Sequence, residues 1–239
     1  QARKFILLSA SLIFYGWWDP RFILLILASV AIDYLCALGI QGRRKQARIL
    51  LSLSLLANLG ILGYFKYLYF FADLFDWTIP PGAIQIILPI GISFYTFQSM
   101  SYTIDVYRKK IEAEKNPLNV ALFVSFFPQL VAGPIVRAGE LLPELKSPYK
   151  LTLENIEIGF PYLLAGLVCK VVVSDSLHPM VTERFAETGV NALQMLLSGQ
   201  FYIVMLYYDF AGYSLMAIGL ARILGIVLPQ NFRSPFAAN

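Results

Sequence analysis

Charged side chains are scarce in this chain. Asp, Glu, Lys and Arg make up 14% of its 239 residues, whereas hydrophobic residues make up 58% and the mean hydropathy is +0.64. A soluble domain is nearer half apolar and about a quarter charged. So few charges cannot cover a water-facing surface. The sequence therefore predicts an all-α polytopic membrane protein in which residues 1–239 form a single transmembrane domain.

The chain is also poor in residues that build metal and catalytic centres, with two cysteines and one histidine. Cys36 and Cys169 lie in apolar runs, where a free cysteine behaves as a small hydrophobe. Neither a disulfide framework nor a metal site is expected. His178 has no nucleophile or second histidine beside it in the sequence. This argues against a hydrolase triad and leaves the chain without a convincing catalytic base.

Long apolar runs dominate the rest. A membrane-spanning helix needs about 20 apolar residues. The candidate segments are 3–18, 22–41, 48–71, 83–105, 118–136, 156–177 and 192–228. The last run is too long for one span, so we expect one crossing followed by a second, partly inserted helix, with glycines allowing the bend. Small residues such as Gly212 and Gly219 also favour close helix packing.

Basic residues gather in alternate loops between these segments. They include Arg43, Arg44, Lys45 and Arg48 after the second segment and Arg108, Lys109, Lys110 and Lys115 after the fourth. The positive-inside rule then predicts a cytoplasmic N-terminus in a multi-pass membrane protein. Anionic lipid facing these loops accounts for the net charge of +4, so no nucleic-acid partner is expected.

Residues 118–136 read LNVALFVSFFPQLVAGPIV, which is apolar but interrupted. Pro128, Gly133 and Pro134 prevent one uninterrupted helix. Both flanks are basic, which predicts a re-entrant segment. Backbone groups freed at membrane depth must be satisfied by protein or by water in a cavity. A broken segment containing Gln129 therefore indicates a polar chamber inside the protein.

Ionisable groups inside membrane segments are costly and are candidate functional residues. The set is Asp33, Lys66, Asp105, Lys170, Asp209 and Arg222. Asp209 is the strongest, because the segment LYYDFAGYSLMAIG around it combines a carboxylate, hydroxyls and glycines. Asp33 fits a structural hydrogen-bonding role better than catalysis. Lys170 and Arg222 could pair with acidic groups or line a cavity.

Three stretches resemble the membrane-bound O-acyltransferase family. They are LPIGISFYTFQSMSYTIDVYR, FFPQLVAGPIVRAGELLPEL and YYDFAGYSLMAIGLARILGIVLPQNFRSPF, in the order that the family has them. The nearest branch is that of bacterial alginate O-acetyltransferase membrane subunits. Family members often read D-F-S-G-Y-S-D where this chain has Ala211 and Leu215 in place of the first serine and the last aspartate.

The resemblance implies tilted helices around a funnel through the membrane. The acyl donor, acetyl-CoA or an acyl carrier protein, would arrive from the cytoplasm as a substrate. The acceptor would be a cell-envelope or exported polysaccharide such as alginate, or an extracytoplasmic acetyltransferase partner. The family histidine follows the equivalent of Asn231, so we expect it beyond Asn239, in a longer acyltransferase. The expected funnel residues are Gln129, Gly133, Pro134, Asp209, Tyr213 and Asn231, none of them catalytic.

Two other classes of function fit some of these features. Broken helices and intramembrane charge also occur in transporters and channels, which would show internal repeats. A non-catalytic membrane scaffold that docks an extracytoplasmic partner is the third reading.

Overall fold

The computed structural model describes residues 2–77, 86–131, 133–147, 152–187, 189 and 191–232. Every regular element in these ranges is helical, which confirms the predicted all-α class. The chain divides into two compact units. Residues 1–131 and 136–147 form the first unit, and residues 132–135 and 148–239 form the second.

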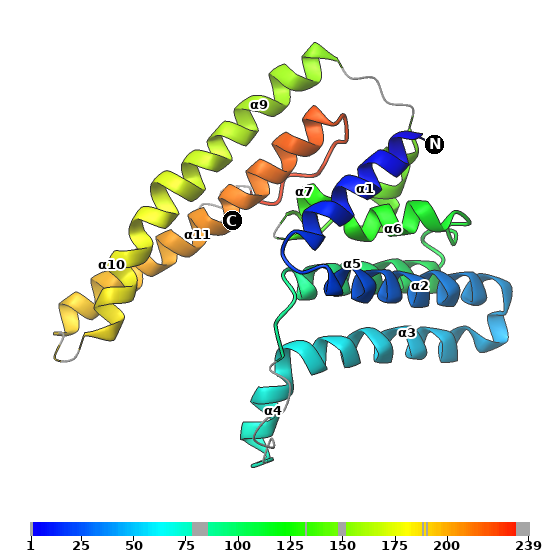
Figure 1. Cartoon of the computed structure of the whole chain (residues 1–239), viewed down its shortest axis with the longest axis horizontal. Helices are drawn as coiled ribbons and strands as arrows, with labels where there is room; N and C mark the ends of the chain where they lie inside the picture. The colour runs from blue at the N-terminus through cyan, green and yellow to red at the C-terminus, as the bar shows by residue number, and fades with distance from the viewer. Residues whose placement is uncertain are drawn as a thin grey trace. The chain divides into compact units, whose positions relative to one another are not determined.

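The first unit contains eight α-helices among its described residues (Figure 1). They are α1 (Ala2–Gly16), α2 (Arg21–Gly42), α3 (Ala47–Leu62), α4 (Leu68–Leu74), α5 (Ile92–Tyr107), α6 (Pro117–Ser125), α7 (Phe127–Leu130) and α8 (Ala138–Lys146). A π-helical segment, Gly63–Tyr67, joins α3 to α4 without a loop. The helix α2 packs against α1, α3, α5 and α6 and so forms the centre of this unit.

The short helix α6 lies at the core of the first unit. All its residues from Asn119 to Ser125 are buried, and α1, α2, α5 and α8 pack around it. Pro117 occupies the first turn, and the Asn116 side chain accepts a hydrogen bond from the Leu118 N–H at 3.0 Å. Proline and asparagine are favoured at these positions because they satisfy or remove the unpaired donors of the first turn.

The second unit is built on two long helices that run side by side (Figure 1). The first combines α9 (Leu153–Leu167), a π-helical segment (Val168–Ser174) and α10 (Asp175–Ala186), and the second is α11 (Ala192–Ile223). Asn191 and Gln194 form a reciprocal capping box at the start of α11, with hydrogen bonds of 2.9 and 3.1 Å. This pair satisfies donors at the helix N-terminus.

The prediction of two helices within 192–228 is wrong. A single 32-residue helix covers Ala192–Ile223, and the chain leaves it at Gly225, whose φ is +71°. Gly212 and Gly219 do not divide the helix. They lie instead where α9 approaches most closely: an added Cβ at Gly219 would be 2.6 Å from the Gly159 carbonyl oxygen, and one at Gly212 would be 2.9 Å from that of Gly166. The expectation of close helix packing is confirmed.

Four helices in the described ranges are long and apolar enough to cross a membrane. They are Arg21–Gly42, Ala47–Leu74, Leu153–Ala186 and Ala192–Ile223. The predicted segment 3–18 forms the 15-residue α1, about 22 Å long at 1.5 Å per residue, which is short for a span. The predicted segment 83–105 begins outside the described residues and yields the 16-residue α5. The chain is a multi-pass membrane protein.

Candidate functional site

The predicted break in the segment 118–136 is confirmed. The α6 helix ends at Ser125, because the next residue, Phe126, has a ψ of 106° that is not helical, and the single-turn α7 with Pro128 follows. Side chains replace part of the missing helical hydrogen bonding. Gln98 Nε2 donates to the Phe123 carbonyl at 2.6 Å, and the Phe127 N–H donates to Ser11 Oγ at 3.2 Å. Such satisfaction by protein groups is what a broken helix at membrane depth requires.

Gln129, in the single-turn α7, has a buried side chain without a hydrogen-bond partner among the described residues. Its side chain is 2% exposed, yet neither its Oε1 nor its Nε2 has a hydrogen-bond partner within the described part of the chain. Buried amides are paired in the large majority of cases, so an unpaired one is a candidate contact for a ligand or an ordered water. Its burial and its unpaired amide are compatible with the funnel role expected from the sequence.

Gly91 brings the first of the three family-like stretches against this segment. It has φ +69° and precedes α5, and an added Cβ would be 2.5 Å from the Leu130 carbonyl oxygen. Only glycine combines this backbone conformation with so close an approach at little cost. The sequence stretches around residues 91 and 129 are therefore in direct contact, which their separation in the chain does not reveal.

Gly133 and Pro134 are both buried. They follow α7 in non-helical backbone and are grouped with the second unit, whereas Gln129 belongs to the first.

In the second unit, Asp209 and Tyr213 lie one turn apart on α11 and both meet Lys170. The Lys170 ammonium is 2.5 Å from Asp209 Oδ1 and 2.8 Å from Asp175 Oδ1, and 5.5 Å from the centroid of the Tyr213 ring. The Lys170 side chain is 23% exposed, and those of Asp209 and Asp175 are 39% and 48% exposed. Two carboxylates share one ammonium, so the ionised cluster keeps an excess of negative charge.

Both intramembrane lysines occur in π-helical segments. Lys170 lies in Val168–Ser174, and Lys66 lies in Gly63–Tyr67, where its Nζ donates to Ser93 Oγ at 3.0 Å. Single-turn π-bulges are rare and are frequent at functional sites. The pairing of Lys170 with Asp175, five residues on, suits the wider turn of this helix. Sequence reasoning singled out Lys170, Asp209 and Tyr213 but did not predict that Asp175 also pairs with Lys170, because no residue pattern predicts a π-bulge.

Asn231 lies apart from that cluster on another side of α11. Its Nδ2 donates to Ser214 Oγ at 3.3 Å, and the neighbouring Phe232 ring packs edge-on against Tyr207 and Phe210 at 5.7 and 5.2 Å. A cavity of about 250 Å³ opens here. Its lining consists of Tyr207, Ala211, Ser214, Leu215, Ile218, Gln230, Asn231 and Phe232. Ala211 and Leu215 are thus cavity-lining positions.

Asp33 has the hydrogen-bonding environment expected of a structural residue. It is completely buried, and its carboxylate accepts hydrogen bonds from Ser54 Oγ at 2.5 Å, from Asn58 Nδ2 at 2.9 Å, and from Ser99. These partners lie on α3 and α5, so the network ties both helices to α2. A buried carboxylate satisfied in this way fixes helix register in a largely apolar unit.

His178 and the cysteines form no centre of their own. His178 is exposed on α10, and its carbonyl accepts the Thr182 hydroxyl at 2.8 Å. Both cysteines are free. Across the described ranges, no group of three His, Cys, Asp or Glu side chains is placed to hold a metal ion.

Comparison with known proteins gives consistent matches. The model of the membrane-bound O-acyltransferase family matches residues 113–239. The chain is 38% identical over 243 residues to the "Probable alginate O-acetylase AlgI" of Azotobacter vinelandii, covering 98% of this chain and 48% of that protein. It is 37% identical to the protein of the same name from Pseudomonas aeruginosa, covering 98% and 46%.

A relative named for a different substrate matches at a similar identity. The "Peptidoglycan O-acetyltransferase" of Helicobacter pylori is 36% identical over 271 residues, covering 98% of this chain and 50% of that protein. The chain therefore spans about half the length of the curated relatives it matches.

Proposed function

We propose, from the premise that this chain belongs to the membrane-bound O-acyltransferase family, that the protein transfers an acyl group to hydroxyls of a cell-envelope or exported polysaccharide. The observation that carries the proposal is the match over 98% of the chain to relatives named for O-acetylation of alginate or of peptidoglycan. Acetyl is accordingly the first choice of acyl group, and an alginate-like uronate polymer is the first choice of acceptor.

The chemistry sets requirements that the described residues meet in part. Attack of a sugar hydroxyl on an acyl donor needs a base for the hydroxyl proton and hydrogen-bond donors for the developing oxyanion. It also needs exclusion of water, which would otherwise take the acyl group. The buried, unpaired Gln129 amide supplies a donor in a water-poor segment. We assign the base to none of the described residues, since His178 is exposed and remote from this segment in the sequence.

The proposal includes the source of the acyl group and the orientation of the protein in the membrane. Acetyl-CoA or an acyl carrier protein would deliver the acyl group from the cytoplasm, and the polysaccharide or an extracytoplasmic acetyltransferase would receive it on the other side. The protein would lie in a bacterial inner membrane with a cytoplasmic N-terminus. The basic loops at residues 43–48 and 108–115 support this orientation, because positively charged loops are retained in the cytoplasm.

Funnel-shaping roles are proposed for the six residues expected from the sequence. Gln129 would contribute its buried amide from the first unit. In the second unit, Gly133 and Pro134 would shape non-helical backbone, and Asp209 and Tyr213 would keep the lining polar through Lys170. Asn231 would line the cavity beside Ser214.

The test is complementation. The complete reading frame that encodes this chain is expressed in a bacterium that makes alginate but lacks its own alginate O-acetylase, and O-acetyl esters on alginate and on peptidoglycan are quantified by NMR. We expect esters to return on one of the two polymers. If neither polymer gains esters although the protein reaches the membrane, and liposomes containing it conduct a solute, the protein is a transporter and the proposal is wrong.

A further inference from the structure

An apolar groove crosses the first unit where α1, α2 and the start of α6 meet. It has a volume of about 580 Å³, within the range of small-molecule sites, about 300–1,000 Å³, and it is open to the outside. Its lining includes Phe5, Leu27, Ala31, Leu35, Leu118 and Ala121. The helix α2, which forms one side of the groove, is apolar enough to cross a membrane.

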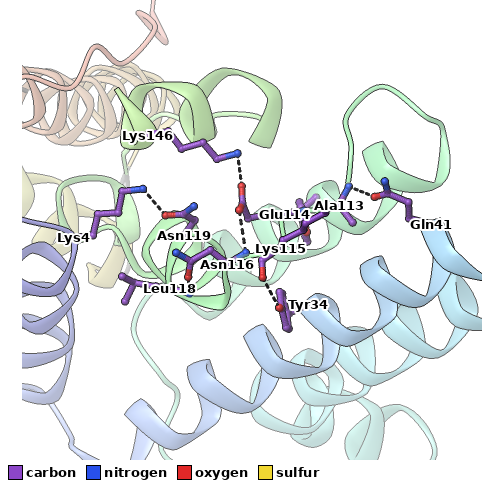
Figure 2. A network of polar contacts seen from close by, with 11 residues as sticks. Lys4, Tyr34, Gln41, Ala113, Glu114, Lys115, Asn116, Leu118, Asn119 and Lys146 are labelled. Atoms are coloured by element: carbon purple, nitrogen blue, oxygen red, sulfur yellow. Dashed lines mark hydrogen bonds and ion pairs between the residues drawn. The ribbon is translucent and has the colours of Figure 1, made fainter. Parts of the chain in front are cut away.

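One end of the groove is polar. Tyr34 and Asn116 line it there, and the Tyr34 hydroxyl donates to the Lys115 carbonyl at 2.8 Å. Lys4 precedes the groove residue Phe5, and its Nζ donates to Asn119 Oδ1 at 2.7 Å. Figure 2 shows these groups converging at the start of α6. The groove therefore has an apolar body and one hydrogen-bonding end.

This end also has an excess of positive charge. Glu114 is nearly buried and pairs with Lys146, so its charge is matched (Figure 2). Lys4 meets only a neutral amide oxygen. Lys115 is exposed and makes no ion pair within the described ranges. Lys4 and Lys115, the chain neighbours of the groove residues Phe5 and Asn116, thus have no matched carboxylate among the described residues.

A rigid frame holds this end in place. The Glu114 N–H donates to the Tyr102 hydroxyl at 2.9 Å, the Ala113 N–H donates to Gln41 Oε1 at 2.6 Å, and Asn116 caps α6. These bonds fix residues 113–116 to α2 and α5. A preformed site binds at a lower cost in conformational freedom than a mobile loop would.

We propose that this groove, with Lys4 and Lys115 at its polar end, is a binding site for one anionic glycerophospholipid. An acyl chain would lie along Leu27, Ala31 and Ala121, and the phosphate would lie beside the ammonium groups. A flexible acyl chain can follow the apolar body of the groove, and the two lysines favour an anionic headgroup over an apolar partner helix.

Native mass spectrometry of the detergent-purified protein tests the site directly. The probes are phosphatidylglycerol and phosphatidylcholine with identical acyl chains, titrated separately. We expect one phosphatidylglycerol to be retained at concentrations where phosphatidylcholine is not. Lys4→Gln and Lys115→Gln should each weaken this retention about fivefold, since a Lys near an anionic lipid surface contributes about 1 kcal/mol.

Matched variants separate the groove from general effects of charge and apolar surface. Ala31→Trp fills the groove and should abolish lipid retention. Ala31→Leu, which should weaken retention, takes its place if the tryptophan variant does not fold. Lys45→Gln and Leu56→Trp change exposed residues outside the groove lining and should leave retention unchanged.

Three results would overturn the proposal. They are equal retention of the two lipids, unchanged retention in the Ala31 variants, and a lipid-free dimer that Ala31→Trp dissociates, which would make the groove a contact between copies of this chain. The readout is lipid mass, so failure of the acyltransferase proposal would leave it intact.

Discussion

Gly166 on α9 and Gly212 on α11 pack directly against each other. A Cβ added at Gly166 would be 2.6 Å from the Gly212 carbonyl oxygen, and the pair Gly159–Gly219 repeats the same approach, again at 2.6 Å. The two contacts are seven residues apart on each helix, as two antiparallel helices in close register require. Small residues at such contacts let helix backbones approach in a membrane, where apolar side chains alone supply little association energy.

The first prediction follows from this contact. Gly166→Ala should lower the midpoint of thermal unfolding in detergent, because an inserted methyl group in a tight contact costs about 1–3 kcal/mol. Gly199→Ala is the matched control, since nothing lies within 4 Å of its added Cβ. It should be neutral or stabilising, because alanine favours a helix by about 1 kcal/mol over glycine. Equal midpoints for the two variants would refute the close contact.

Gly91 should tolerate substitution even less well. Gly91→Ala combines a left-handed backbone with a Cβ 2.5 Å from the Leu130 carbonyl oxygen. Gly189 has φ +85° but open space around it, so Gly189→Ala carries the backbone cost alone, about 1–2 kcal/mol. The Gly91 variant should therefore unfold at the lower temperature. Similar losses would mean that contact with the broken segment contributes nothing.

Gln129 offers a way to separate function from stability. Gln129→Leu removes an unpaired buried amide and should leave stability unchanged or raise it by about 1–3 kcal/mol, while acyl transfer in the complementation assay falls. Gln98→Leu is the control, because this amide is 4% exposed and bonded to the Phe123 carbonyl, and its loss should destabilise the protein. Undiminished transfer by stable Gln129→Leu protein would remove Gln129 from the proposed site.

Lys170 and Asp209 should be energetically coupled. Lys170→Met leaves two neighbouring carboxylates without their ammonium and should destabilise more than Asp209→Asn does. A double-mutant cycle on thermal stability should give a coupling of about 1 kcal/mol, modest because both side chains are partly exposed. Lys66→Met serves as the comparison, since the Lys66 ammonium hydrogen-bonds a neutral hydroxyl. A coupling energy near zero would show that the Lys170–Asp209 ion pair does not contribute to stability.

Glu114 should make stability depend on acid pH. Burial raises the pKa of Glu114, but hydrogen bonds from Lys146, the Asn116 N–H and Asn119 outweigh it, and the pKa lies below its ordinary value. The stabilisation is therefore complete above the unfolded-state pKa of about 4.3 and is lost as the pH falls through the lower folded-state value.

The measurement compares unfolding midpoints of the wild type and Glu114→Gln from pH 6 to pH 3. Their difference should shrink as the pH falls across that window. Glu112→Gln, at an exposed neighbour, should show no such trend, and a constant difference for Glu114→Gln would contradict the ion pair.

Several features of the candidate site could be predicted from residue types alone. Pro128 and its neighbours predicted a broken helix, because proline cannot continue the helical hydrogen bonding, and Asp209 stood out because a charge in an apolar run is costly. The fate of residues 192–228 could not be predicted. Glycine permits either a bend or a close contact, and only the position of Gly159 and Gly166 on α9 decides which.

Composition and order along the chain determined that this is an all-α membrane protein with an interrupted segment, since hydrophobicity and proline chemistry act locally and need no partner. The tertiary structure decided which groups meet. It put Lys170 between Asp175 and Asp209, set Gly91 against Leu130, and left the Gln129 amide buried without a partner within the described ranges. Contacts between Lys170 and Asp209 or between Gly91 and Leu130 depend on how segments distant in the chain approach one another, which no local residue preference encodes.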